Sequence, residues 1–370
     1  MKTMILALMT TFSLCCQAAD NVVLVTIDGL RWQELFSGID KTLAMDEKYN
    51  DQTDLIMEKF WDADPARRAE KLMPFLHKSV FKQGRYAGNR NANSCARVNN
   101  EWYFSYPGYS EILTGLVDPS LNSNQKKPNP NRTFMEQLNE TVAFKDKVVA
   151  FASWDVFPYI FNVERSNIRV NIGDEKPMSQ EIISLNDLSH DLPRPWKTVR
   201  FDVFTHRFAL NSMRTKNPRV LFVSYGETDD FAHDAKYDEY VLAANRTDRF
   251  IQELWAEINK NPAYKDNTVL FITTDHGRGS DPIETWQHHA SGKATRGFLS
   301  SLSQYKQGIV GSNEVWMAAM GAGVSDAGLV VTGNDCLTSD RIAATLLRLL
   351  GQNLTTEQTA MGSAIEAFVK

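Results

Sequence analysis

The stretch Asn21-Val22-Val23-Leu24-Val25-Thr26-Ile27-Asp28-Gly29 decides the fold class. Seven mostly apolar residues, rich in valine, lead directly into Asp-Gly, a pair that is typical of turns. An apolar run of this kind predicts a central strand of a parallel sheet, which is covered on both faces. The same form recurs in four later runs, at 148–152, 220–225, 268–273 and 315–320.

Helix-like stretches lie between these runs, at 132–140, 240–259 and 339–351. In the last of them Ile342, Leu346 and Leu349 recur at helical spacing, and Gly351 is a stop signal. Alternating buried strands and helices predict a layered α/β fold with a mostly parallel sheet. Functional sites of such folds lie beyond the carboxyl ends of the strands.

Two segments interrupt this alternation. Residues 37–84 are charged and aromatic without a clear buried strand, and residues 156–200 are rich in Pro, Asn and Ser. We interpret both as cap insertions over the site, within a single catalytic domain that covers residues 20–370.

The composition is that of an ordinary globular protein. The 370 residues are 43% hydrophobic and 23% charged, which excludes a mostly disordered, collagenous or disulfide-dense chain. The net charge is −5, and no run of lysine and arginine is long enough to indicate a nucleic-acid track.

The N-terminus has the pattern of an export signal. Lys2 precedes an apolar stretch at 4–14, and small residues follow up to Ala19. The pattern predicts a signal peptide at 1–19 and an exported, periplasmic or secreted protein without a membrane span after its removal; the alternative is a buried N-terminal helix. The mature chain then keeps Cys95 and Cys336, which form one disulfide or remain two free thiols.

Metal-ligating residue types gather in four clusters, three of which follow a predicted strand. Zinc binds imidazole nitrogen and carboxylate oxygen, and its catalytic sites keep a position open for substrate. Each cluster alone is more often a turn or a solvated surface, but together they supply three carboxylates and at least three imidazoles, enough for two metal ions. The clusters are Asp28, Asp229 with His233, Asp275 with His276, and His288 with His289.

A candidate nucleophile lies between the first two strands, in Ser105-Tyr106-Pro107-Gly108, with Thr114-Gly115 at positions +9 and +10. A serine at a helix start lies among exposed backbone amides that favour anions. The alternative is a helix-capping serine without chemistry.

In the order and spacing of these motifs, the chain resembles the alkaline phosphatase superfamily, in the branch of type I phosphodiesterases and nucleotide pyrophosphatases. In that branch a strand ends in Asp-Gly, the nucleophile segment reads Thr/Ser-x-Pro-Asn, and Asp-x-x-x-His, Asp-His-Gly and one further His follow. The resemblance covers residues 21–351 and implies a three-layer sandwich with cap insertions.

The resemblance also implies the role of each site residue. The first zinc ion would be held by Asp229, His233 and a later histidine, and the second by Asp28, Asp275 and His276, with Ser105 as the nucleophile; other divalent metals are alternatives. For the later histidine we prefer His289 to His288, because it stands three residues after Trp286.

Two departures from the family pattern bear on the substrate. The Asn at +3 is replaced by Gly108, so another donor or backbone amides would hold the phosphoryl oxygens. Sulfatases have Arg at +4, where this chain has Tyr109, so we read Ser105 as an unmodified hydroxyl. Further candidates for substrate contact are Tyr106, Arg97 and the flanking cations Arg278, Lys293 and Arg296, any of which is otherwise a core or surface residue.

The motifs therefore predict a two-metal hydrolase of small phosphoric esters that acts through a covalent phosphoseryl intermediate. The branch resemblance favours phosphodiesters or pyrophosphates over phosphomonoesters. The alternatives are a sulfuric- or phosphonic-ester hydrolase on the same scaffold and a non-catalytic relative. Nothing in the sequence indicates an oligomeric state.

Overall fold

A large mixed sheet forms the centre of the computed structural model, which describes residues 18–352 and 361–370. All but the last two residues of the predicted signal peptide lie outside the described residues. The strands, in spatial order, are β10 (Gly328–Leu329), β2 (Arg85–Ala87), β9 (Met317–Gly321), β7 (Thr268–Thr273), β1 (Asn21–Ile27), β6 (Val220–Tyr225), β4 (Val148–Ala152) and β5 (Arg169–Asn171).

Strand β1 lies in the middle and is parallel to both of its neighbours, β6 and β7. Thr26 pairs with Ser224 on one side and with Thr273 on the other, which aligns the carboxyl ends of the three strands. The run at 315–320, which we grouped with the buried parallel strands, behaves differently: β9 begins at Met317 and is antiparallel to β7. Its carboxyl end therefore lies at the opposite edge from the site.

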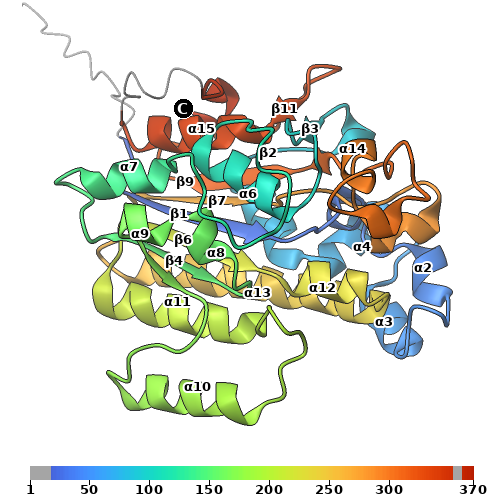
Figure 1. Ribbon diagram of the computed structural model, residues 1–370, viewed down its shortest axis with the longest axis horizontal. Helices are drawn as coiled ribbons and strands as arrows, with labels where there is room; N and C mark the ends of the chain where they lie inside the picture. The colour runs from blue at the N-terminus through green and yellow to red at the C-terminus, as the bar shows by residue number, and fades with distance from the viewer. Residues whose placement is uncertain (1–17, 353–360) are drawn as a thin grey trace, which may run out of the picture.

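Helices cover both faces of this sheet (Figure 1). The alternation of side chains along β1 sends Val23 and Val25 into one hydrophobic cluster and Val22 and Leu24 into another. The first cluster packs under α11 (Asp202–Lys216) and α13 (Tyr237–Lys260), and the second under α6 (Ser105–Thr114), α7 (Phe134–Glu140) and α15 (Ile342–Leu349). The predicted three-layer α/β sandwich with a mostly parallel sheet is thus confirmed.

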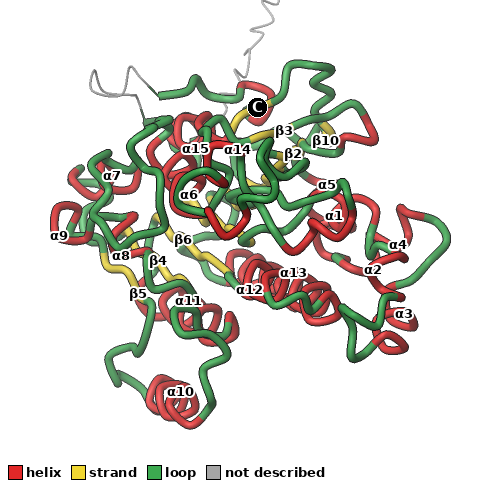
Figure 2. Tube along the Cα trace, turned by 45° about the vertical axis from the view of Figure 1, so that its right-hand side comes forward, coloured by secondary structure: helices red, strands yellow, loops and turns green. Residues whose placement is uncertain are grey.

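The two segments that we interpreted as insertions differ from each other. Residues 37–84 form short helices whose apolar side chains, such as Ile56 and Phe60, join the first cluster: α2 (Lys41–Met45), α3 (Thr53–Phe60), α4 (Pro65–Leu72), η1 (Leu76–Val80) and α5 (Phe81–Gln83). Residues 156–200 contain α8 (Phe157–Ile160), α9 (Val163–Ser166), the edge strand β5 and α10 (Gln180–Asp191), which stands at the periphery (Figure 2). The second segment therefore also extends the central sheet.

A disulfide links two neighbouring strands of a second, small sheet at the residues that precede them. Its strands, in order, are β11 (Leu337–Thr338), β3 (Ala96–Arg97) and β8 (Glu314–Val315). Cys95 and Cys336 immediately precede β3 and β11 and are bonded to each other. Of the two alternatives that the sequence left open, the structure therefore contains the disulfide.

The remaining elements are short: α1 (Trp32–Ser37), η2 (Arg90–Ala92), α12 (Glu227–His233), η3 (Ile283–Gln287), α14 (Gly292–Thr295), η4 (Ser300–Leu302), η5 (Ser339–Arg341) and η7 (Glu366–Phe368). Over residues 18–352 and 361–370, no helix is both long enough and apolar enough to cross a bilayer.

Candidate metal centre

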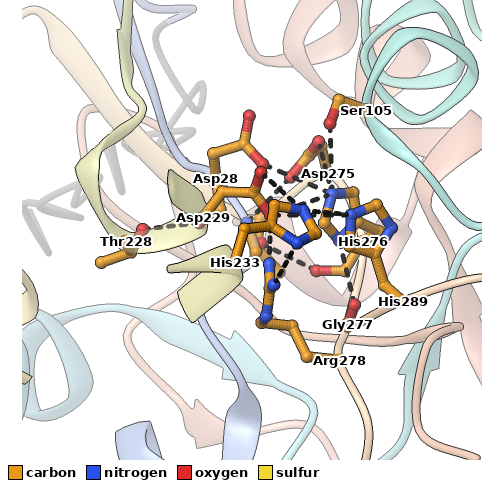
Figure 3. A network of polar contacts seen from close by, with 12 residues as sticks. Asp28, Ser105, Thr228, Asp229, His233, Asp275, His276, Gly277, Arg278 and His289 are labelled. Atoms are coloured by element: carbon orange, nitrogen blue, oxygen red, sulfur yellow. Dashed lines mark hydrogen bonds and ion pairs between the residues drawn. The ribbon is translucent and has the colours of Figure 1, made fainter. Parts of the chain in front are cut away.

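Three adjacent strand ends carry the site. Asp28 follows β1, α12 with Asp229 and His233 follows β6, and Asp275-His276 follows β7. Because β6, β1 and β7 are neighbours and parallel, their carboxyl ends meet at one edge, and the side chains point toward one another there (Figure 3).

One group of ligand atoms surrounds His276. Its Nε2 lies 3.4 Å from Asp28 Oδ1 and 3.4 Å from Asp275 Oδ2, and all three residues are buried. Asp28 Oδ1 and Asp275 Oδ2 are buried oxygens without a hydrogen-bond partner among the described residues. Buried carboxylate oxygens that lack donors cost free energy unless a cation binds them, so these residues fit a metal ion.

The ionisation of these acids supports the same conclusion. Burial raises the pKa of Asp28 well above its ordinary value, and the charge of Asp229 raises it further. Burial also raises the pKa of Asp275 well above its ordinary value, and the charge of Asp28 adds to the effect. Acids that resist ionisation in this way lack counter-charge, which divalent cations supply.

A second group of ligand atoms lies beside the first. His233 Nε2 is 3.3 Å from Asp229 Oδ2 and 3.1 Å from His289 Nε2, and His289 Nε2 is 3.7 Å from Asp229 Oδ1. Burial lowers the pKa of His289 well below its ordinary value, so its ring is neutral and offers a lone pair to a metal. The His288 ring centre is 6.4 Å from that of His233, so the structure brings His289 and not His288 to this group.

The nucleophile candidate faces the same cluster. Ser105 is the first residue of α6, is 5% exposed, and its Oγ lies 3.2 Å from His276 Nε2. One imidazole nitrogen has one lone pair, so His276 Nε2 serves a single ion. Asp229, His276 and His289 also lie close enough together to hold an ion, but His276 Nε2 is nearer to Asp28 and Asp275, at 3.4 Å from each, than to Asp229, at 3.8 Å. These distances and the unpartnered oxygens favour His276 for the set with Asp28 and Asp275, which would leave His233 for the set with Asp229 and His289.

Contacts behind the ligands orient them. The Tyr109 hydroxyl donates to Asp28 Oδ2 at 2.9 Å and accepts from Ser224 Oγ at 3.1 Å. The His276 Nδ1 atom lies 2.9 Å from the carbonyl oxygen of Gly277, and His289 Nδ1 lies 2.9 Å from that of Tyr103. Imidazoles held in this way present Nε2 to a metal ion.

Arg278 lies behind Asp229 rather than at the substrate side. It is 1% exposed, and its Nη1 donates to Asp229 Oδ1. Burial opposes the ionisation of Asp229, but the charges of His233 and Arg278 outweigh it and hold the pKa of that carboxyl well below its usual range.

Two glycines allow these groups to approach. Gly29 has φ +59°, and a Cβ there would come 2.8 Å from Arg278 Nη1 and 2.9 Å from Asp229 Oδ1. A Cβ on Gly108 would come 2.3 Å from the Asp275 carbonyl oxygen, so the first turn of α6 rests against the backbone of a ligand residue. The Asn that the family pattern has at this position does not fit this packing.

The remaining substrate-contact candidates lie elsewhere. Tyr106 is buried, and its hydroxyl donates to the carbonyl oxygen of the exposed loop residue Lys127 at 2.6 Å, so its tip is engaged with that loop. Arg97 is exposed on β3. Lys293 and Arg296 are also exposed, and Lys293 pairs with Glu101 at 2.6 Å.

Comparisons with known proteins agree with this arrangement. The model of the family described as type I phosphodiesterase / nucleotide pyrophosphatase matches residues 40–290. The chain belongs to this family. The match includes Ser105 and all the ligand candidates except Asp28, which lies before it.

Solved structures with a similar fold include a sulfatase, an alkaline phosphatase and a phosphonate monoester hydrolase. A 2-O GAG sulfatase is similar with a TM-score of 0.60 at 12% identity, over 94% of this chain and 73% of the other. The wild-type alkaline phosphatase PafA is similar with a TM-score of 0.57 at 12% identity, over 96% of this chain and 99% of the other. A phosphonate monoester hydrolase from Silicibacter pomeroyi is similar with a TM-score of 0.52 at 13% identity, over 95% of this chain and 76% of the other. A search of curated proteins found no match. The chain thus shares its fold with these structures.

Sequence reasoning missed three contacts of this site. Tyr109 stands four residues after Ser105 in one helix, so helical spacing would have placed both on one face. Arg278 directly follows Asp-His-Gly, and we considered it only as a charge near the substrate. Asn124, whose Oδ1 accepts from the Tyr106 N–H at 2.9 Å beside Ser105, lies in a loop without a sequence signal.

Proposed function

We propose that the protein is an exported two-metal hydrolase of phosphoric esters that acts through a covalent phosphoseryl intermediate on Ser105. The observation that carries the proposal is the convergence of five clustered ligand candidates, with His233 3.3 Å from one of them (Asp229 Oδ2), on one edge of the sheet, where the Ser105 hydroxyl lies 3.2 Å from His276 Nε2. The proposed ligand sets are Asp229, His233 and His289 for one ion, and Asp28, Asp275 and His276 for the other.

Zinc is the metal that this donor set favours. Mixed imidazole and carboxylate ligands suit zinc, whereas magnesium and calcium prefer oxygen alone. Two such ions would supply positive charge that favours the ionised nucleophile and stabilises the leaving oxygen of the ester.

The protein's own groups position the reaction. The Ser105 oxygen attacks phosphorus, and its bond to phosphorus forms as the bond to the leaving oxygen breaks. Water then cleaves the bond from Ser105 to phosphorus and regenerates the hydroxyl, which releases a phosphomonoester from a diester substrate, or phosphate from a monoester. The start of α6 offers few backbone donors, because the Tyr106 N–H donates to Asn124 Oδ1, Pro107 has no N–H and the Gly108 N–H donates to the Phe104 carbonyl oxygen; the Ser105 N–H is the candidate backbone donor to a phosphoryl oxygen. Asn124 Oδ1 accepts from the Tyr106 N–H at 2.9 Å beside Ser105, so its side-chain amide is a candidate donor to a phosphoryl oxygen.

The substrate class follows from the family. We favour a phosphodiester or pyrophosphate over a phosphomonoester, because the chain belongs to the type I phosphodiesterase family and because Arg278 is engaged with Asp229. Tyr109, which stands where sulfatases have Arg, is bonded to Asp28, which supports an unmodified Ser105.

Export is supported by the N-terminal pattern and by the Cys95–Cys336 disulfide, since disulfides persist in oxidising compartments. We also propose that residues 20–370 form one catalytic domain. Fractionation of cells that express the full chain, with mass spectrometry of the mature N-terminus, tests export; an intact Met1 in the cytoplasm would contradict it.

Replacing the nucleophile tests the mechanism. Ser105→Ala is expected to reduce kcat on nitrophenyl phosphate and on a matched phosphodiester by at least about 10³-fold while two zinc ions remain bound. Ser110→Ala, a buried serine of the same helix that accepts from Asn129, is the matched control and should remain active. Full activity of Ser105→Ala would show that Ser105 is not the nucleophile. A preference of the wild-type protein for the matched sulfate ester would refute phosphoric esters as the substrate class.

A further inference from the structure

Arg278 connects two of the elements that carry one metal site. Its Nη1 donates to Asp229 Oδ1 on α12, its Nε donates to the Trp286 carbonyl oxygen at 2.9 Å, and its Nη2 donates to the Gln287 carbonyl oxygen. Trp286 and Gln287 immediately precede the His288-His289 pair. One guanidinium group therefore holds a ligand carboxylate and the backbone that presents a ligand imidazole (Figure 3).

The surroundings of Arg278 are closely packed. The side chain is 1% exposed, and the space beside its Nη1 is closed by Gly29, where any Cβ would come within 2.8 Å. A buried arginine is costly unless each donor finds an acceptor. Here the acceptors are the ligand Asp229, the two carbonyl groups and His233 Nδ1, which lies 3.4 Å from Nη2, so the free energy of burying the charge is recovered only when the ligands are in place.

We propose that Arg278 is a positioning residue that aligns Asp229 with His289, so that filling of their metal site, and not of the Asp28–Asp275–His276 site, depends on it. The inference rests on the proposed pair of ions. Because Arg278 occupies Asp229 Oδ1, it leaves Oδ2, which faces His233 Nε2 at 3.3 Å, as the oxygen for the ion. The other site has no comparable dependence, because Asp28 is held by Tyr109 and Asp275 by the Gly29 N–H at 3.1 Å.

The charge of Arg278 opposes its positioning effect. A positive group beside Asp229 repels a cation, so removal of the charge alone would tighten zinc binding. Removal of the contacts alone would loosen it, and second-layer contacts of this kind are typically worth about 10–100-fold in metal affinity. Arg278→Met removes both the charge and the contacts, whereas Arg278→Lys keeps the charge and loses the planar set of donors.

Zinc binding by itself tests the proposal. Competition of a chromophoric chelator with the zinc-loaded protein should resolve two binding constants in the wild type. In Arg278→Met we expect one constant to weaken by about 10–100-fold and the other to change less than about threefold, with a smaller loss in Arg278→Lys. Excess zinc should restore hydrolysis by Arg278→Met. The control Lys293→Met, which removes an exposed charge that pairs with Glu101, should leave both constants unchanged.

Anomalous scattering from crystals of Arg278→Met grown at limiting zinc identifies the affected site. We expect full occupancy beside Asp28, Asp275 and His276 and depleted occupancy beside Asp229. Tighter binding at Asp229, an equal loss at both sites, or a variant that does not fold even in excess zinc would overturn the proposal. A wild type that binds no zinc would instead refute the proposed function itself.

Discussion

Gly108→Ala tests whether Ser105 acts from the position in which α6 holds it. The added Cβ would lie 2.3 Å from the Asp275 carbonyl oxygen and 3.0 Å from the carbonyl carbon, and both are backbone atoms that cannot rotate away. An ordinary contact is at least about 3.4 Å, so α6 and the segment after β7 must separate by roughly 1 Å. Ser105 precedes Gly108 by three residues in the same first turn and moves with it. A misplacement of about 1 Å costs roughly 10²-fold in rate.

The assay is the hydrolysis of a nitrophenyl phosphodiester by zinc-loaded protein, with urea unfolding measured in parallel. We expect kcat to fall by about 10²-fold while the zinc content stays at two ions. Overpacking costs about 1–3 kcal/mol, whereas alanine gains about 1 kcal/mol over glycine in a helix, so the variant should lose at most roughly 2 kcal/mol of stability. Gly173→Ala, where a Cβ has no neighbour within 4 Å, is the control. Wild-type kcat in Gly108→Ala would refute this reasoning.

Two further variants probe contacts around the site and the core. Tyr109→Phe removes the hydroxyl that donates to Asp28, and we expect zinc at the Asp28–Asp275–His276 site to bind about tenfold more weakly. The control is Tyr106→Phe, which removes a hydroxyl that donates to the Lys127 carbonyl group. Equal zinc affinity in the two variants would contradict the role of Tyr109. Burial raises the pKa of Asp248, which accepts from the Phe75 and Leu76 N–H groups, to about 7. Because this folded-state pKa exceeds the unfolded value of about 4, the stability linked to Asp248 is present below pH 4 and is lost as the pH rises toward 7. Urea unfolding between pH 4 and 7 should therefore show a flatter profile for Asp248→Asn than for the wild type, and parallel profiles would exclude this linkage.

The fold was readable from the sequence because its decisive signals are local. The apolar run at 21–27 and the runs before Asp229 and Asp275 each form a strand, and polar residues follow each of them. The antiparallel direction of β9 was not readable, because a run of apolar residues carries no direction. The strand β5 was hidden in the polar segment 156–200 because it has only three residues.

The site was readable to the extent that ligands follow strands. Asp28, Asp229 and Asp275 come directly after or close to strand ends, and the parallel pairing of β6, β1 and β7 brings them together. What the sequence did not reveal depends on packing between distant elements. The engagement of Arg278 with Asp229 and the fit of Gly108 against Asp275 require contacts across 49 residues and 167 residues of chain.

The double pairing of β1 also makes hydrolysis a readout of correct folding. Val25 lies opposite both Val223 and Ile272, so a slip by one residue would break two ladders at once. Such a slip would carry Asp28 about 3.3 Å along the strand and turn it to the other face of the sheet. A chain trapped in that arrangement would be compact yet catalytically silent, so recovered turnover after refolding counts only molecules whose central strand has found its native alignment.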